Sequence, residues 1–324
     1  MRHVITGGSG FTGTYLAQEL IRDGERVLIF DLVPPPPELQ GAAEFIAGDI
    51  RRPQDLANIG LTPDDVVYHL AARQFHLAVP TRKQDAWFAD VNVNGTRAVL
   101  QAMEAASASR LIYLSTDMVY GWPIQVPLGA DHPLRPLGPY GRTKLQSEHL
   151  LNAARSRGMQ VTIFRPRLIS GPGRLGILTK LFALIRHNLP VPMIGAGKNC
   201  YQMIAVEDCV SAMLAALRHG LPSGPFNLGS EDPPQVRSLL QNLIEQAHSK
   251  SILVPTWGPG VKGILGILNK CGMPVLHPEQ YLIADAQYVL DTSQTEQALD
   301  WKPMRSDADM LVAAYEVYLK MQTS

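Results

Sequence analysis

Tyr140 and Lys144 are spaced so that they could carry out proton transfer. They lie just after Pro139, at the start of a segment with helical spacing, so their side chains are expected on one helix face, a turn apart. A phenol has a reference pKa of about 10 and is a poor base near neutral pH, but an adjacent ammonium favours the phenolate. Tyr140 could then exchange a proton with a substrate hydroxyl. Thr116, at the end of an expected strand, could hydrogen-bond to the same oxygen.

A glycine-rich turn joins the first expected strand to the first expected helix. Residues 6–13 read TGGSGFTG and hold the spacing G-x-G-x-x-G at Gly8, Gly10 and Gly13. Glycines let the turn close and the backbone approach a pyrophosphate, while the N–H groups and dipole at the helix start favour an anion. A glycine-rich turn without a ligand is the alternative. The strand before, the helix after and an acid at the end of the second strand favour a dinucleotide site.

That acid is Asp31, which follows the expected strand at 26–30. A carboxylate at this place accepts hydrogen bonds from both hydroxyls of the adenine ribose and repels a 2′-phosphate. No arginine follows in the next three residues, which begin with Leu32, so NAD is expected rather than NADP. An ordinary turn-forming role for Asp31 is the other interpretation.

The elements that must position these residues alternate between strand-length apolar segments and segments of helical period. Strands are expected at 3–6, 26–30, 44–47, 66–70, 111–115 and 161–164, and helices at 15–22, 94–106, 145–155 and 175–188. Several strands are apolar at successive positions, as expected when helices cover both sheet faces. The pattern predicts an α/β fold of the Rossmann type, with a doubly wound parallel sheet. Frequent glycine and proline after residue 164 predict a smaller C-terminal lobe.

Composition excludes several other classes of protein. Basic and acidic residues number 29 each among 324, so there is no global field to hold a nucleic acid. The three cysteines, Cys200, Cys209 and Cys271, have no metal-site or disulfide spacing, which indicates reduced thiols, no bound metal and a cytoplasmic location. No apolar run reaches the roughly 18–20 residues of a membrane span.

Taken together, the motifs resemble those of the extended short-chain dehydrogenase/reductases of the NAD-dependent epimerase/dehydratase family. This family includes nucleotide-sugar epimerases, dehydratases and 3β-hydroxysteroid dehydrogenases. The resemblance is carried along most of the chain by residues 6–13, 48–50, 69–72, 92–96, 115–121, 140–144, 165–166 and 206–208.

The resemblance implies a set of residues around NAD. It places Asp49 against adenine, residues 69–72 beside the cofactor and Pro166 near nicotinamide. The expected cofactor-binding residues are Gly7, Gly10, Phe11, Thr12, Gly13, Asp31, Leu32, Asp49, Ile50, Leu70, Ala71, Ala72, Asn92, Tyr140, Lys144 and Pro166. Thr116, Tyr140 and Lys144 are the expected catalytic residues.

The resemblance also implies how the chain is divided. Residues 1–167 are expected to form the NAD-binding domain, completed by about 199–230. Residues 168–198 and 231–324 are expected to form the substrate-binding lobe. A homodimer is expected, because dimers formed by two helices per subunit are common in the family.

Residues after Thr116 distinguish among members of the family. In sugar 4,6-dehydratases an acidic residue two places on removes a carbon-bound proton, as does a glutamate in glucuronate decarboxylases; this chain has Met118 there, and a thioether is no base. A 4-epimerase needs only the threonine, tyrosine, lysine and a tightly held NAD. Asp117 is either an added acid or a hydrogen-bonding residue at the strand end. The favoured hypothesis is a nucleotide-sugar 4-epimerase working through a transient 4-keto intermediate.

The substrate-binding half departs from the familiar epimerase pattern. Leu168 replaces an asparagine, and Tyr201 an arginine, that often bind diphosphate in such enzymes. Candidate substrate contacts are Arg73, Asp117, Arg167, Arg174, Lys180 and Tyr201. Arginines and lysines such as Arg167, Arg174 and Lys180 are more often solvated or structural residues than substrate contacts. The alternative function is a dehydrogenase or reductase of a secondary alcohol or ketone, like a 3β-hydroxysteroid dehydrogenase or a keto-sugar reductase. The least favoured is a non-catalytic NAD sensor.

Overall fold

A parallel sheet of seven strands lies at the centre of the described protein. The structure is a computed structural model and describes residues 1–324 except 76, 174, 177, 273–274 and 323–324. The strand order is β10-β6-β5-β4-β1-β2-β3. The strands are β1 (Arg2–Thr6), β2 (Arg26–Asp31), β3 (Glu44–Ala47), β4 (Val66–His69), β5 (Arg110–Leu114), β6 (Gln160–Pro166) and β10 (Phe226–Leu228). The chain starts at β1 and winds outwards in both directions, which confirms the doubly wound α/β fold.

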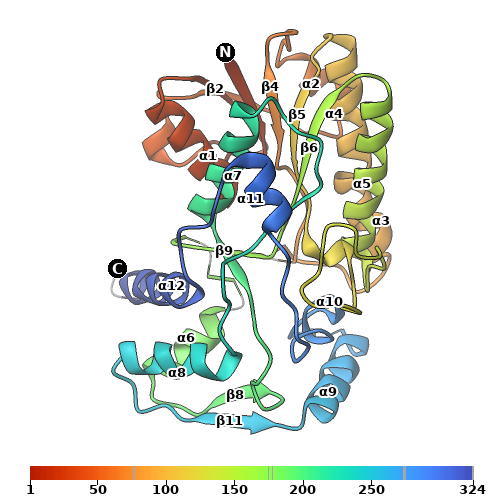
Figure 1. Ribbon diagram of the computed structural model, residues 1–324. Helices are drawn as coiled ribbons and strands as arrows, with labels where there is room; N and C mark the ends of the chain where they lie inside the picture. Colours follow the sequence, from red (N-terminus) through yellow and green to blue (C-terminus); the bar gives the residue numbers. More distant parts are fainter. Residues whose placement is uncertain (76, 174, 177, 273–274, 323–324) are drawn as a thin grey trace.

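Helices cover both faces of this sheet, as Figure 1 shows. On one face, α1 (Phe11–Arg22) and α7 (Val206–Arg218) share a buried core with alternate strand residues such as Ile5 and Ile29. On the other face, α4 (Asn94–Ala105) and α5 (Pro139–Ser156) pack on the intervening strand residues, such as Val4 and Leu28. Successive strand side chains point to opposite faces, so continuously apolar strands feed both cores.

The rest of the chain is built mainly around a separate apolar cluster, drawn below the sheet in Figure 1. Its elements and their neighbours are β7 (Leu168–Ser170), α6 (Leu178–Arg186), β8 (Val191–Ile194), β9 (Met203–Ala205), α8 (Val236–Gln246), β11 (Leu253–Thr256), α9 (Gly258–Lys270), α10 (Pro278–Tyr281) and α12 (Asp307–Met321). Helix α11 (Ser293–Leu299) instead packs beside α7 and β10, and its Leu299 belongs to a core of the central sheet. β8 pairs with β11 and β7 pairs with β9, both in parallel.

Two short helices and two 3-10 turns complete the described elements, and most differences from the predicted elements lie at their ends. These are α2 (Pro53–Ala57), α3 (Gln84–Asn92), η1 (Pro37–Leu39) and η2 (Asp117–Val119). Helix α1 begins at Phe11 rather than at residue 15, so that the last residues of the glycine motif already form its first turn.

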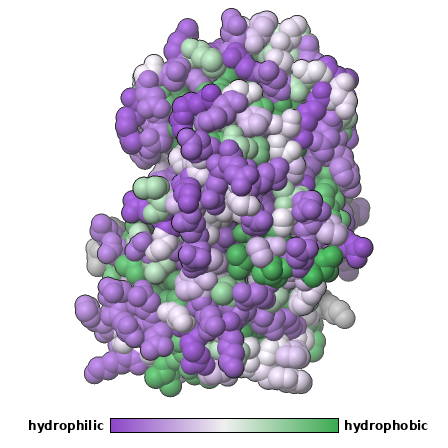
Figure 2. All heavy atoms as spheres, in the orientation of Figure 1, coloured by the Kyte–Doolittle hydropathy of each residue, from purple (hydrophilic) through white to green (hydrophobic). Residues whose placement is uncertain are grey.

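The surface shown in Figure 2 is mostly hydrophilic, with hydrophobic residues scattered and in small groups. Among the described residues, no helix is both long enough and apolar enough to cross a membrane.

Candidate active site

Helix α5 presents the predicted catalytic pair from its first two turns. Tyr140 and Lys144 are 5% and 2% exposed. The Tyr140 hydroxyl accepts a hydrogen bond from the Gln74 amide at 3.0 Å. The Lys144 ammonium donates to the Leu114 carbonyl at 2.6 Å and lies 4.0 Å from the centre of the Tyr113 ring. Both side chains are therefore buried and held in place beside the carboxyl end of β5.

Burial governs the charge of Lys144. It lowers the pKa of this lysine to about 7, although the Glu148 carboxylate acts in the opposite direction. An ammonium is costly at this position, and at neutral pH the charged and neutral forms are close in free energy. A negative charge forming on a neighbouring oxygen would favour the ammonium.

Thr116 begins a chain of buried polar contacts at the end of β5. Its hydroxyl donates to Asp117 at 3.1 Å, and Asp117 forms an ion pair with Arg167 at 2.6 Å. The Arg167 guanidinium lies 4.9 Å from the Tyr201 ring and 4.4 Å from the Tyr288 ring. Burial acts to lower the pKa of Arg167, but Asp117 and the two tyrosines outweigh it and raise that pKa. This geometry favours the hydrogen-bonding interpretation of Asp117 over an added acid.

The glycine turn is packed so closely that side chains would not fit. Gly7 has a φ of +74°, and a Cβ there would meet the backbone nitrogen of Ala71 at 2.6 Å. A Cβ on Gly13 would meet the Gly7 carbonyl oxygen at 2.5 Å and the Cα of Gly8 at 2.6 Å. The N-cap of α1 is Gly10, which has no side chain to cap the helix. The N-cap position therefore leaves room for a ligand at the start of α1, where backbone N–H groups favour a bound pyrophosphate.

Asp31 lies where the sequence predicts a ribose-binding carboxylate, at the end of β2 beside the glycine turn. It accepts hydrogen bonds from the backbone N–H groups of Ser9 at 3.0 Å and Leu32 at 2.7 Å. Burial raises the pKa of Asp31, and these bonds oppose that rise. The glycine turn, the helix start and this carboxylate together fit a dinucleotide.

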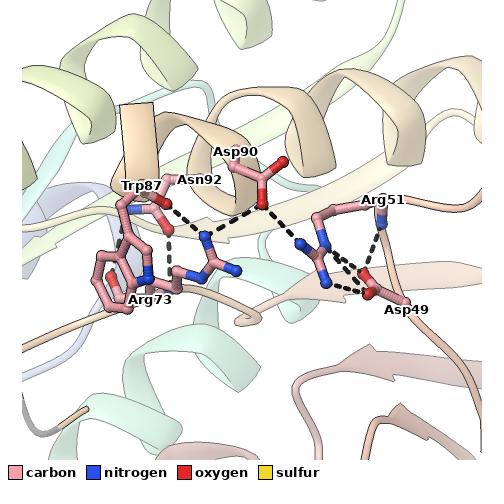
Figure 3. A network of polar contacts seen from close by, with 6 residues as sticks. All are labelled: Asp49, Arg51, Arg73, Trp87, Asp90 and Asn92. Atoms are coloured by element: carbon pink, nitrogen blue, oxygen red, sulfur yellow. Dashed lines mark hydrogen bonds and ion pairs between the residues drawn. The ribbon is translucent and has the colours of Figure 1, made fainter. Parts of the chain in front are cut away.

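A network of charges ties Asp49 to Arg73, as Figure 3 shows. Asp49 pairs with Arg51 at 2.5 Å, Arg51 pairs with Asp90 at 2.6 Å, and Asp90 pairs with Arg73 at 3.1 Å. Arg73 also donates to the Trp87 carbonyl at 2.6 Å and lies over the Trp87 ring. Arg73, predicted as a substrate contact, instead points towards α3. The prediction missed this because Asp90 and Trp87 lie on a helix that the sequence pattern does not show.

Asn92, predicted to contact the cofactor, joins the segment after β4 to the catalytic helix. Its side-chain oxygen accepts from the Arg73 backbone N–H at 2.8 Å, and its amide donates to the Thr143 hydroxyl at 3.1 Å. Leu70, Ala71 and Ala72 belong to the same segment.

The other predicted residues lie on several different elements. Pro166 ends β6, and Ile50 is buried against Gly95. Thr12 is buried in α1, where Phe11 is the first residue. Lys180 is exposed on α6, away from these contacts. Arg174 lies outside the described residues.

Sequence reasoning missed two residues that hydrogen-bond to Tyr140. Gln74 donates to its hydroxyl, and Glu279 accepts a hydrogen bond from its backbone N–H at 2.9 Å. Gln74 follows the predicted HLAA motif by two residues, which was the available signal. Glu279 is 139 positions away, and no local pattern links it to the site.

Comparison with known proteins identifies the family. The sequence model of the NAD dependent epimerase/dehydratase family matches residues 3–229. The chain belongs to this family. This NAD dependent epimerase/dehydratase is therefore an enzyme, and NAD is its cofactor.

Relatives of this epimerase/dehydratase differ in activity. It is 26% identical to a UDP-glucose 4-epimerase from Lactobacillus helveticus, over 97% of this chain and 95% of the relative. It is 30% identical to a 4-hydroxy-2-methyl-3-oxo-4-farnesyl-3,4-dihydroquinoline-1-oxide ketoreductase from Stigmatella aurantiaca, over 78% of this chain and 75% of the relative. The structure of a UDP-glucose 4-epimerase with UDP-glucose from Thermotoga maritima has the same fold, with a TM-score of 0.79 and 24% identity over 99% of this chain and 100% of that one.

Proposed function

We propose that this enzyme interconverts two nucleotide sugars that differ in configuration at carbon 4, through a transient 4-keto sugar. The observation that carries this proposal is a buried Thr116, Tyr140 and Lys144 set whose acidic neighbour, Asp117, is already paired with Arg167. Tyr140 and Lys144 supply the residues that proton transfer needs, and the Asp117 carboxylate is used in an ion pair. The full-length similarity to a UDP-glucose 4-epimerase supports the same reaction.

Thr116, Tyr140 and Lys144 each have a distinct role in the proposed reaction. Tyr140 takes the proton from the sugar 4-hydroxyl and later returns it, and Thr116 hydrogen-bonds to the same oxygen. The Lys144 ammonium stabilises the phenolate form of Tyr140. Bound NAD would supply the acceptor for the hydride from carbon 4 and its return to the opposite face of the ketone. In this proposal residues 1–167 and about 199–230 hold the cofactor, and residues 168–198 and 231–324 hold the sugar nucleotide.

Dehydration fits this site less well than epimerisation. Elimination of water from the 4-keto sugar needs a base for a carbon-bound proton and an acid for the leaving hydroxyl. Met118 offers no base. Asp117 is already paired with the buried Arg167 guanidinium, so its carboxylate is not available to serve as that acid. The site therefore favours return of the hydride to the 4-keto sugar.

The ketoreductase relative favours a second candidate, reduction of an apolar ketone with release of the oxidised cofactor. The two functions differ in what happens to the dinucleotide. An epimerase regenerates its cofactor in every turnover, whereas a reductase consumes one reduced cofactor per product. Whether the protein retains NAD, and whether turnover consumes a reduced cofactor, therefore distinguishes the epimerase from the reductase.

The test uses native protein purified without added dinucleotide. Mass analysis of the denatured protein should find NAD. Incubation with UDP-glucose or dTDP-glucose, followed by chromatography, should show the 4-epimer of at least one of them, with no NADH absorbance in the filtrate. A Tyr140→Phe variant serves as the control for contaminating activity. Release of NADH in proportion to product, or ketone reduction that depends on added NADH, would replace the epimerase with the second candidate.

A further inference from the structure

Helix α5 is capped by a residue from the far end of the chain. Glu279, on α10, is 2% exposed, and its two carboxylate oxygens accept hydrogen bonds from the backbone N–H groups of Tyr140 and Gly141, each at 2.9 Å. The first N–H groups of a helix have no partner within the helix, and the N-cap residue here, Gly138, has no side chain to supply one. Glu279 thus supplies the cap for the turn that carries the catalytic tyrosine.

Gly138 makes room for this carboxylate. A Cβ on Gly138 would overlap the Glu279 side chain. The φ of Gly138 is −151°, an extended conformation that any residue adopts, so backbone strain does not require glycine here. The small residue is needed for the space that the carboxylate fills.

A second contact connects the same segment to the Tyr140 ring. His277, the N-cap of α10, stacks on Phe75 with ring centres 4.6 Å apart. Phe75 in turn packs edge-on against the Tyr140 ring at 5.3 Å. Its neighbour Gln74 donates to the Tyr140 hydroxyl. The α10 segment therefore contacts Tyr140 both at its main chain and, through Phe75, at its ring.

We propose that Glu279 is a positioning residue, whose ionised carboxylate fixes the first turn of α5 and so holds Tyr140 in place for proton transfer. The role in proton transfer rests on the proposed function, whereas the capping of α5 does not. Because α10 belongs to the part of the chain assigned to the substrate, the cap also links that part to the catalytic turn.

The charge of Glu279 is set by its surroundings. Burial raises its pKa to about 7; the N–H groups of Gly141 and Tyr140 and the charge of Arg142 on α5 oppose this rise, and Asp85 on α3 adds to it. Burial lowers the pKa of His277, so that ring is neutral in the same range. Above about pH 7 the carboxylate is ionised and accepts both bonds, and below it the protonated group is a weaker acceptor. The pKa of Lys144 is also about 7, so a pH–rate profile alone would not separate the ionisation of Glu279 from that of Lys144.

The test is hydrogen exchange of the α5 start, which needs no substrate. Mass spectrometry would follow the peptide spanning residues 138–145 in the full chain. Glu279→Gln removes one acceptor and the charge, and Gly138→Ala displaces the carboxylate without changing it. Each should lower the protection of this peptide about tenfold at pH about 8.

Asp208→Asn is the matched control. Asp208 is also a buried carboxylate that accepts two backbone N–H groups from a distant segment, those of Met304 and Arg305, each at 3.0 Å. This variant should leave protection of the α5 start unchanged. Equal protection in wild type and Glu279→Gln, or the same loss in Asp208→Asn, would overturn the proposal.

Turnover gives a second readout once a substrate is in hand. Glu279→Gln should lower kcat about tenfold, because a small misplacement of a catalytic group is costly, with KM and bound NAD unchanged. Asp208→Asn should keep the wild-type kcat. A wild-type kcat in Glu279→Gln would overturn the positioning role. If no nucleotide sugar is converted, the proposed function is wrong, but hydrogen exchange still tests whether Glu279 caps α5.

Discussion

Replacing Lys144 with methionine should stabilise the fold while abolishing turnover. The lysine is 2% exposed, and burial lowers its pKa from 10.5 to about 7. Methionine has a similar length and shape but carries no charge that must be desolvated. Turnover should fall at least about a hundredfold, because the phenolate of Tyr140 loses its stabilising ammonium.

The size of the stability change depends on pH. A pKa lowered from 10.5 to about 7 corresponds to about 5 kcal/mol of destabilisation while the buried lysine is charged. The variant also loses the hydrogen bond to Leu114 and the contact with the Tyr113 ring, together about 3 kcal/mol, so the net gain near pH 6 is about 2 kcal/mol. Above about pH 7 the folded lysine is neutral while the unfolded one still binds a proton, so wild-type stability rises relative to the variant. The difference in stability should change by about 3 kcal/mol between pH about 7 and about 9, so that the advantage of the variant vanishes near pH 9.

Urea unfolding of dinucleotide-free protein, followed by tryptophan fluorescence at pH about 6, 7.5 and 9, measures this difference. Lys180→Met is the matched control, because Lys180 is exposed on α6 and its replacement should change the free energy of unfolding by less than about 0.5 kcal/mol at each pH. A Lys144→Met variant that is less stable than wild type near pH 6, or whose difference from wild type does not vary with pH, would refute the reasoning.

Three further changes test other parts of the site. Tyr140→Phe should lower turnover about a hundredfold or more while mass analysis still finds bound NAD, and near-normal turnover would remove Tyr140 from the mechanism. Asp31→Ser combined with Leu32→Arg should shift the ratio of dissociation constants towards NADP, and a wild-type protein that already binds NADP more tightly would contradict the role of Asp31. Asp117→Asn should lower the free energy of unfolding by about 3 kcal/mol, because Arg167 remains buried without its counter-ion; a change under about 0.5 kcal/mol in urea titration would contradict this.

The sequence alone was enough to predict what depends on local pattern. The strand at residues 44–47 is observed as β3 with the same bounds, and the other predicted strands appear in the central sheet. The inner strands could be predicted because buried parallel strands are continuously apolar. The glycine turn was equally predictable from the sequence, because its closure depends on residues within the turn. Lys144 and Tyr140 share a helix, and a four-residue spacing decides that they share a face.

What the sequence could not predict depends on contacts between distant segments. Helix α3 buries Phe88 and Asn92 but has no clear apolar stripe, so the partners of Arg73 were not foreseen. The Asp117–Arg167 pair joins residues 50 positions apart, and it forms because the start of η2 lies beside the end of β6. Glu279 could not be connected to Tyr140 at all, because only the folded chain brings α10 to the start of α5.

The central claim, that hydride leaves and returns to the same sugar, is tested most directly with a nucleotide sugar deuterated at carbon 4. Enzyme that carries its own NAD would be incubated with this substrate, and both epimers and the free cofactor would be examined by mass spectrometry and NMR. The account predicts that the product epimer keeps deuterium at carbon 4 and that no label enters free dinucleotide. Deuterium lost from the product, or found in released NADH, would contradict it.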